Sequence, residues 1–149
     1  RLGDVLGELQ HDFAVQLKKK NISLEIMELS TLDPMVCDRS RMKQVLSNLV
    51  GNAIKFTNFK GTIKVDVVQE PQSMTIKIVD NGIGIEREDI PHIFERFYKA
   101  DRSRGYEGTG LGLAIARHIV QSHGGSLSVE SQIGEGSEFR IILPQTFVD

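Results

Sequence analysis

The sequence predicts an α+β fold: a two-layer α/β sandwich in which three helices cover one face of a mixed, mostly antiparallel sheet. Four segments alternate strictly between apolar and polar residues, as strands with one buried and one wet face do; they are residues 63–67, 74–78, 127–129 and 139–143. Two longer segments, 40–56 and 111–123, repeat apolar residues at helical spacing. Each of these helices therefore has an apolar face that can cover the sheet.

Shorter elements complete the predicted fold. Apolar residues recur at helical spacing over 4–19, and this segment ends in three lysines, which suit a helix C-terminus. Short strands are expected at 22–27 and 35–37, and a short third covering helix at 87–93. Either Asp38 or Ser40 is expected to cap the helix that ends near Phe56.

Composition narrows the class of protein. The chain has 149 residues, 40% hydrophobic and 26% charged, which is typical of one soluble domain. Its net charge of −2 favours no nucleic-acid partner, and its single cysteine, Cys37, excludes a disulfide framework within the chain. Without a signal peptide or a long apolar run, the chain is expected to be a cytoplasmic piece of a longer protein. Whether that parent lies in the cell membrane is left open.

Glycines indicate a phosphate site. Half of the 14 glycines fall into G-x-G groups, at 82–84, 108–112 and 134–136, and the second group opens the predicted 111–123 helix. Glycine is a costly start for a helix, but it leaves backbone N–H groups free to contact phosphate oxygens. The chain has no GxxxxGK[ST] motif, and no strand precedes GTGLGL. Neither a P-loop nor a dinucleotide-binding turn is therefore predicted.

Four polar residues are candidates for the rest of the site. Asn48, Asn52 and Lys55 are spaced i, i+4, i+7, so they share one face of the 40–56 helix. This face is either simply solvated or a site in which an amide oxygen holds Mg²⁺ and the lysine lies near phosphate. Asp80 follows a strand and is either a turn residue or an acceptor for the exocyclic amine of adenine.

Five segments resemble, in order, the N, G1, F, G2 and G3 boxes of sensor histidine kinases. They are NLVGNAIKFT (48–57), VDNGIGI (79–85), IFERFY (93–98), GTGLGLAIARHIVQSHGG (108–125) and GEGSEF (134–139). The match covers about residues 22–144. The chain thus resembles the catalytic and ATP-binding domain of that family, which has the Bergerat fold. The resemblance implies that residues 1–20 are the C-terminal tail of a dimerisation helix and 21–149 the catalytic ATP-binding domain.

The resemblance also implies roles for individual residues. Asn52 corresponds to the Mg²⁺ ligand, Asp80 to the residue that reads adenine, and Phe94 with Phe97 to the aromatic anchors of a lid over ATP. The expected catalytic residues are Asn48, Asn52, Lys55 and Lys99. The expected nucleotide-binding residues are Asn48, Asn52, Lys55, Asp80, Gly82, Gly84, Ile85, Phe97, Lys99, Gly108, Thr109, Gly110, Leu111, Gly112 and Leu113.

The implied function is transfer of the γ-phosphoryl group of Mg·ATP to a histidine, with ADP as product. His11 begins HDFAV, which lacks the Thr-Pro of the family's acceptor motif, so the acceptor is expected on a dimerisation domain outside this chain. The implied partners are that domain, through which the parent would form a homodimer, and a response regulator. Asn48 stands where related ATPases carry a glutamate, and an amide cannot act as a general base. The alternative is a nucleotide-binding switch or scaffold that transfers no phosphate.

Overall fold

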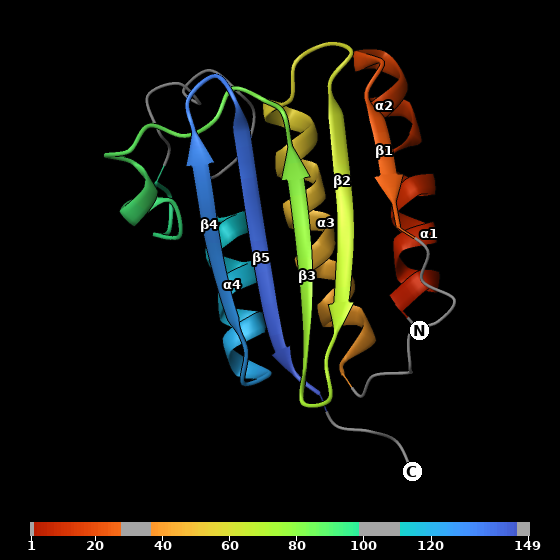
Figure 1. The fold of residues 1–149 in the computed structure, drawn as a ribbon, viewed down its shortest axis with the longest axis vertical. Helices are drawn as coiled ribbons and strands as arrows, with labels where there is room; N and C mark the ends of the chain where they lie inside the picture. Colours follow the sequence, from red (N-terminus) through yellow and green to blue (C-terminus); the bar gives the residue numbers. More distant parts are fainter. Residues whose placement is uncertain (1, 28–36, 99–110, 146–149) are drawn as a thin grey trace.

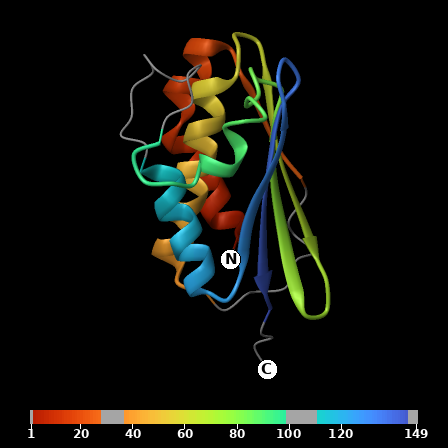
Figure 2. The same ribbon diagram turned by 90° about the vertical axis from the view of Figure 1, so that its left-hand side faces the viewer.

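The structure is a computed structural model, and it describes residues 2–27, 37–98 and 111–145. Helices form one layer and a sheet the other, as Figures 1 and 2 show from two sides. The elements in chain order are α1 (Leu2–Asp12), α2 (Ala14–Lys20), β1 (Ser23–Ile26), α3 (Arg39–Phe56), β2 (Thr62–Gln69), β3 (Ser73–Asp80), the 3₁₀ helix η1 (Ile90–His92), α4 (Gly112–Ser122), β4 (Ser126–Gln132) and β5 (Gly136–Pro144).

The sheet has five strands in the order β1-β2-β3-β5-β4. The strands β1 and β2 run parallel, and the other neighbours are antiparallel, so the predicted mixed, mostly antiparallel sheet is confirmed. Burial alternates along β3 between buried and partly exposed residues, with Met74, Ile76 and Ile78 facing the helices. The opposite face has charged residues such as Lys64 and Asp66 on β2, as one-sided alternation predicts.

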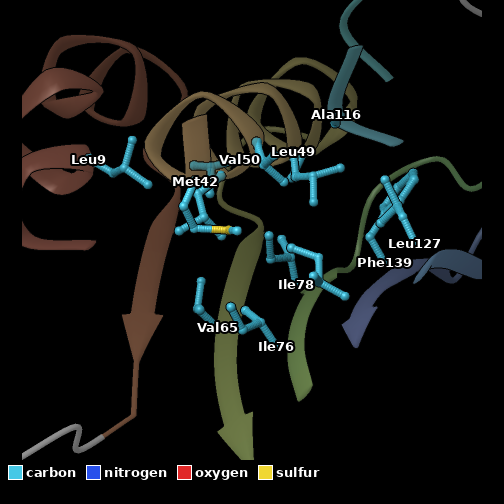
Figure 3. Packing of buried hydrophobic residues seen from close by; sticks show 14 of the residues in the cluster. Leu9, Met42, Leu49, Val50, Val65, Ile76, Ile78, Ala116, Leu127 and Phe139 are labelled. Atoms are coloured by element: carbon cyan, nitrogen blue, oxygen red, sulfur yellow. The ribbon is translucent and has the colours of Figure 1, made fainter. Parts of the chain in front are cut away.

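The core lies between the two layers (Figure 3). Helix α3 contributes seven buried residues along one face, which is the stripe predicted from its helical spacing. The strands contribute β-branched residues such as Val65 and Ile76, and β5 adds Phe139, which is 1% exposed. Helix α4 adds Ala116, and α1 adds Leu9. Packing on both sides of α3 therefore fixes the orientation of its remaining polar face.

The N-terminal helix differs from the prediction, because it is two helices separated at Phe13. Helix α1 buries Val5, Leu6 and Leu9, whereas α2 buries no residue. The Phe13 ring packs over Gly51 of α3, where an added β-carbon would lie 3.4 Å from the ring. The break lets the chain follow α3 up to Lys20.

Of the short helix predicted at 87–93, the structure has only three residues, and these form a 3₁₀ helix. The segment consists of turns and the three-residue η1. Pro91 donates no hydrogen bond, and Ile93 is the one buried apolar residue of the segment, so nothing holds a full amphipathic helix against the core. The third helix that covers the sheet is instead α1.

Asp38 is confirmed as the α3 cap, because its carboxylate accepts a hydrogen bond from the Arg41 N–H at 3.1 Å.

Two further expectations concern the strand at 35–37 and membrane-spanning segments. Of the strand expected at 35–37, residues 35 and 36 lie outside the described residues, and Cys37 lies in a bend. Among the helices that the structure describes, none is both long and apolar enough to cross a lipid bilayer.

Candidate functional site

The C-terminal end of α3 lies at the end of the sheet where β3 ends (Figure 1). The polar face of α3 is the row of residues at spacings i, i+4 and i+7. Asn48, Asn52 and Lys55 follow one another on this face, and all three are partly exposed. The neighbouring residues Leu49 and Ala53 are buried at 0% and 2% exposure, so the helix cannot rotate without losing its core contacts. The polar row is therefore held in a fixed direction.

Asn48 joins α3 to the first residue of α4. Its amide Nδ2 donates a hydrogen bond to the carbonyl oxygen of Gly112 at 3.1 Å. A β-carbon on Gly112 would lie 3.8 Å from the same amide, which is an ordinary contact. One turn further along α3, the side chain of Asn52 makes no hydrogen bond to another described residue. The Asn52 amide is thus the better candidate of the two for a ligand atom.

Asp80 is the buried acidic residue at the end of β3, and it is 7% exposed. Its Oδ1 accepts a hydrogen bond from the Gly82 N–H at 2.9 Å. Burial raises the pKa of Asp80, while hydrogen bonds from the backbone of Gly82 and Ser137 act in the opposite direction. A buried carboxylate with these two backbone partners is well suited to accept a further hydrogen bond from a ligand.

The glycines after Asp80 approach other backbone segments closely. A β-carbon on Gly82 would lie 2.2 Å from the carbonyl oxygen of Phe56 at the end of α3, and one on Gly84 would lie 2.2 Å from the carbonyl oxygen of Gln132. Gly84 also has a positive φ of 75°. These two glycines therefore let the loop after β3 fit between α3 and β4. Glycine is required here by contacts with the protein's own backbone.

Two polar residues that the sequence analysis missed hold this region together. Thr57 is 1% exposed, and its hydroxyl donates to the carbonyl oxygen of Ala53 at 2.5 Å. Ser131 accepts from the Ile85 N–H at 2.8 Å and donates to the Gly136 carbonyl at 2.9 Å. Thr57 could have been found as the polar residue that ends an apolar helix, whereas Ser131 requires knowledge of the strand register.

The predicted aromatic anchors separate into two kinds. Phe94 packs edge to face on Phe139 with 6.4 Å between ring centroids, and the Arg117 guanidinium lies 5.2 Å from the Phe94 ring centroid. Phe97 is instead 70% exposed, with a φ of 64°. Phe94 therefore anchors the segment between η1 and residue 98, whereas the Phe97 ring is mostly open to solvent.

The remaining candidates divide by position. Ile85 and Leu113 pack against the core with part of their surface, and Leu111 is partly exposed just before α4. Lys99, Gly108, Thr109 and Gly110, together with the expected lid, lie outside the described residues. In the described part of the chain no three His, Cys, Asp or Glu side chains form a group that could hold a metal ion.

Comparison with known proteins places the chain in a family. The model of the histidine kinase-, DNA gyrase B- and HSP90-like ATPases matches residues 37–146. The sensor histidine kinase RppB of Synechocystis sp. is 40% identical over 146 residues, which cover 96% of this chain and 32% of RppB. The chain spans between 18% and 32% of the length of the first curated relatives that it matches.

Solved structures give the same grouping. The histidine kinase ThkA in complex with the response regulator TrrA has a TM-score of 0.81 and 29% identity, over 98% of this chain and 41% of that one. Full-length ShkA in complex with AMPPNP has a TM-score of 0.87 and 26% identity, over 99% of this chain and 31% of that one. The chain belongs to the family of histidine kinase-, DNA gyrase B- and HSP90-like ATPases, and the relatives named here are histidine kinases.

Proposed function

We propose that this chain is the ATP-binding catalytic domain of a sensor histidine kinase. In this proposal it transfers the γ-phosphoryl group of Mg·ATP to a histidine on a dimerisation domain outside the chain. The observation that carries the proposal is the meeting of three segments at one end of the sheet: the polar face of α3, the start of α4, and the loop after Asp80. The ShkA complex with AMPPNP supports a nucleotide at the corresponding site.

Asp80 is proposed to recognise adenine. One carboxylate oxygen already accepts the Gly82 N–H, which orients the group, and the other can accept the exocyclic amine of adenine. Guanine has a carbonyl oxygen at that position, so two acceptors would face each other. Because Asp80 is buried, a mismatch there would not be relieved by water.

Asn52 is proposed to hold Mg²⁺ through its side-chain oxygen. An amide oxygen is a neutral hard donor, and nucleotide-bound Mg²⁺ usually takes one or two protein ligands and fills its octahedron with phosphate and water oxygens. The side-chain amide of Asn52 has no hydrogen-bond partner among the described residues, which fits this role. When bound, the ion would neutralise charge that develops on the phosphates during transfer.

The start of α4 is proposed to face the phosphates, with Lys55 and Lys99 nearby. The first N–H groups of a helix lack partners within the helix, and the positive end of its dipole favours anions. Asn48 holds the first residue of α4 through the Gly112 carbonyl. Since an amide cannot remove a proton from water, Asn48 favours transfer to an acceptor over hydrolysis.

The acceptor histidine is proposed to lie on the parent's dimerisation domain, with residues 1–20 as the end of the helix that leads to it and 21–149 as the catalytic domain. His11 is exposed on α1, but its sequence lacks the Thr-Pro of the acceptor motif. The ThkA complex with TrrA supports a response regulator as the downstream partner. We propose a homodimeric parent and a cytoplasmic location for this domain, where ATP is available.

A transfer assay tests the proposed function. The chain is incubated with γ-labelled Mg·ATP and the parent's purified dimerisation domain, and acid treatment separates labile phosphohistidine from stable phosphoserine. We expect acid-labile label on the dimerisation domain, and none when Asn52→Ala replaces the wild-type chain. Binding of ATP without any label on the partner would instead identify a nucleotide-dependent switch, and acid-stable label would identify a serine or threonine kinase.

A further inference from the structure

The C-terminal end of α3 has an unusual set of hydrogen-bond partners. The last turn of any α-helix leaves four carbonyl groups without partners inside the helix. In α3 the first of these, on Ala53, accepts from the N–H of Thr57 at 2.9 Å and from its hydroxyl. The last one, on Phe56, accepts from the Ile83 N–H in the loop after β3 at 3.1 Å.

The two carbonyls between them are both bound by Lys20, which lies more than 30 residues away in the sequence. The Lys20 ammonium donates to the carbonyl oxygens of Ile54 at 2.7 Å and Lys55 at 2.9 Å. It also donates to the carbonyl of Thr57, just beyond the helix, at 3.0 Å. These three bonds use all three donors of an ammonium group and set a positive charge at the negative end of the helix dipole.

The segment that carries Lys20 is itself attached to α3. Lys20 is the last residue of α2, and α2 lies beside the upper part of α3 (Figure 2). The Lys60 N–H donates to the Lys20 carbonyl at 2.9 Å, which ties the end of α2 to the turn that follows α3. Phe13, at the other end of α2, packs over Gly51, the residue before Asn52. The segment 13–20 therefore contacts α3 along the turns that carry Asn52 and Lys55.

We propose that Lys20 is a positioning residue for the phosphoryl transfer that this chain carries out. Lys20 holds the last turn of α3 in place. Lys55 lies on the surface of this turn, and the Phe56 carbonyl of the same turn binds the loop that contains Gly82. Adenine recognition and phosphate contact thereby depend on a residue that touches neither. This inference rests on the proposed function, and it goes beyond it by assigning part of the site geometry to the N-terminal helices.

The proposal has a thermodynamic consequence. If docked α2 favours the nucleotide-binding geometry, then bound nucleotide favours docked α2 by the same factor, because coupling between two sites is reciprocal. A residue that merely stabilises the fold would lower the melting temperature and leave the affinity of the folded protein unchanged. Affinity, measured where every variant is folded, therefore separates the two roles.

The test compares Lys20→Met, which keeps the apolar stem, with Lys19→Met, which removes the same charge from an exposed neighbouring site. The affinity for Mg·ATP is measured by calorimetry at a temperature where both variants are folded by circular dichroism. We expect Lys20→Met to bind about fivefold or more weakly, a factor typical of coupling between sites, and Lys19→Met to bind as the wild type does. Lys20→Arg, which restores the charge and several donors, should recover part of the loss.

Equal affinities of Lys20→Met and the wild type would overturn the proposal. If Lys20→Met does not fold, Lys20→Gln, which retains two donors, is compared with Lys19→Gln in the same way. Hydrogen exchange of the Ile83 amide gives a second readout: it should be faster in the Lys20 variant, and an unchanged rate would contradict the coupling through Phe56. A wild-type chain that binds nucleotide but transfers no phosphate would refute the proposed function and leave the affinities to decide the role of Lys20.

Discussion

Replacement of Asp80 by asparagine should weaken adenine nucleotide binding while it leaves the fold intact. The carboxylate is 7% exposed, and one of its oxygens accepts the Gly82 N–H at 2.9 Å. An asparagine oxygen can keep that bond, but its NH₂ group then faces the adenine amine with a second donor. The loss of one charged buried hydrogen bond, about 1.5–3 kcal/mol, corresponds to roughly ten- to hundredfold in Kd.

The same variant should not lose stability in the absence of nucleotide. Burial raises the folded-state pKa of Asp80 above the unfolded value of about 3.9, so the folded chain binds more protons than the unfolded chain between these two pKa values. The buried charge therefore does not lower the free energy of unfolding at a pH below both pKa values, and it lowers it fully at a pH above both. At neutral pH Asp80→Asn removes that cost, and ATP binding to the wild type should weaken as the pH falls through the folded pKa.

Calorimetric titrations with ATP, ADP and GTP, together with thermal melts, measure these effects. Asp66→Asn is the matched control, since Asp66 is exposed on the open face of β2. We expect the control to bind as the wild type does, and the wild type to prefer ATP over GTP clearly. Unchanged ATP affinity in Asp80→Asn, or equal affinities of the wild type for ATP and GTP, would refute adenine recognition by Asp80.

Three further predictions concern other parts of the chain. Asn52→Ala should abolish phosphoryl transfer and leave the circular dichroism spectrum unchanged. The control Gln44→Ala, at an exposed position on the same helix, should leave transfer intact. Transfer retained in Asn52→Ala would show that Asn52 is not part of the metal site. Gly82→Ala should lose nucleotide binding, because the new β-carbon would lie 2.2 Å from a backbone oxygen. Gly7 in α1 has open space around it, so Gly7→Ala should raise the free energy of unfolding by about 0.5–1 kcal/mol. The chain incubated alone with labelled ATP should acquire little label, and strong acid-labile label that His11→Ala removes would mean that the acceptor is His11.

The architecture could be predicted because both layers have clear periodicity. The buried residues of α3 recur at a spacing of 3.6, and the inward residues of β2, β3 and β5 at a spacing of 2 from Phe139 onward in β5. The local pattern therefore predicts both the fold class and the side of each element that faces the core. The break at Phe13 could not be predicted in this way, because the Phe13 ring packs over Gly51 on another helix. The segment around Pro91 contains helix-like residues but too little apolar surface to bury.

The site could be predicted only in part, for a related reason. Asn48 and Asp80 stand out in the sequence as polar residues in unusual local contexts, and the structure joins Asn48 to α4 and buries Asp80. Sequence spacing alone could not reveal that the Gly82 loop rests on the end of α3, or that Lys20 binds that end. Such contacts depend on the tertiary fold, and they become visible once the elements are placed in space.

A crystal structure of the chain with Mg·AMPPNP would test the proposed nucleotide site most directly. We expect the adenine amine within hydrogen-bond distance, about 3 Å, of the Asp80 carboxylate, and Mg²⁺ about 2.1 Å from the Asn52 side-chain oxygen. The phosphates should lie at the start of α4. A nucleotide whose base is bound away from Asp80, or whose metal has no contact with Asn52, would contradict the account.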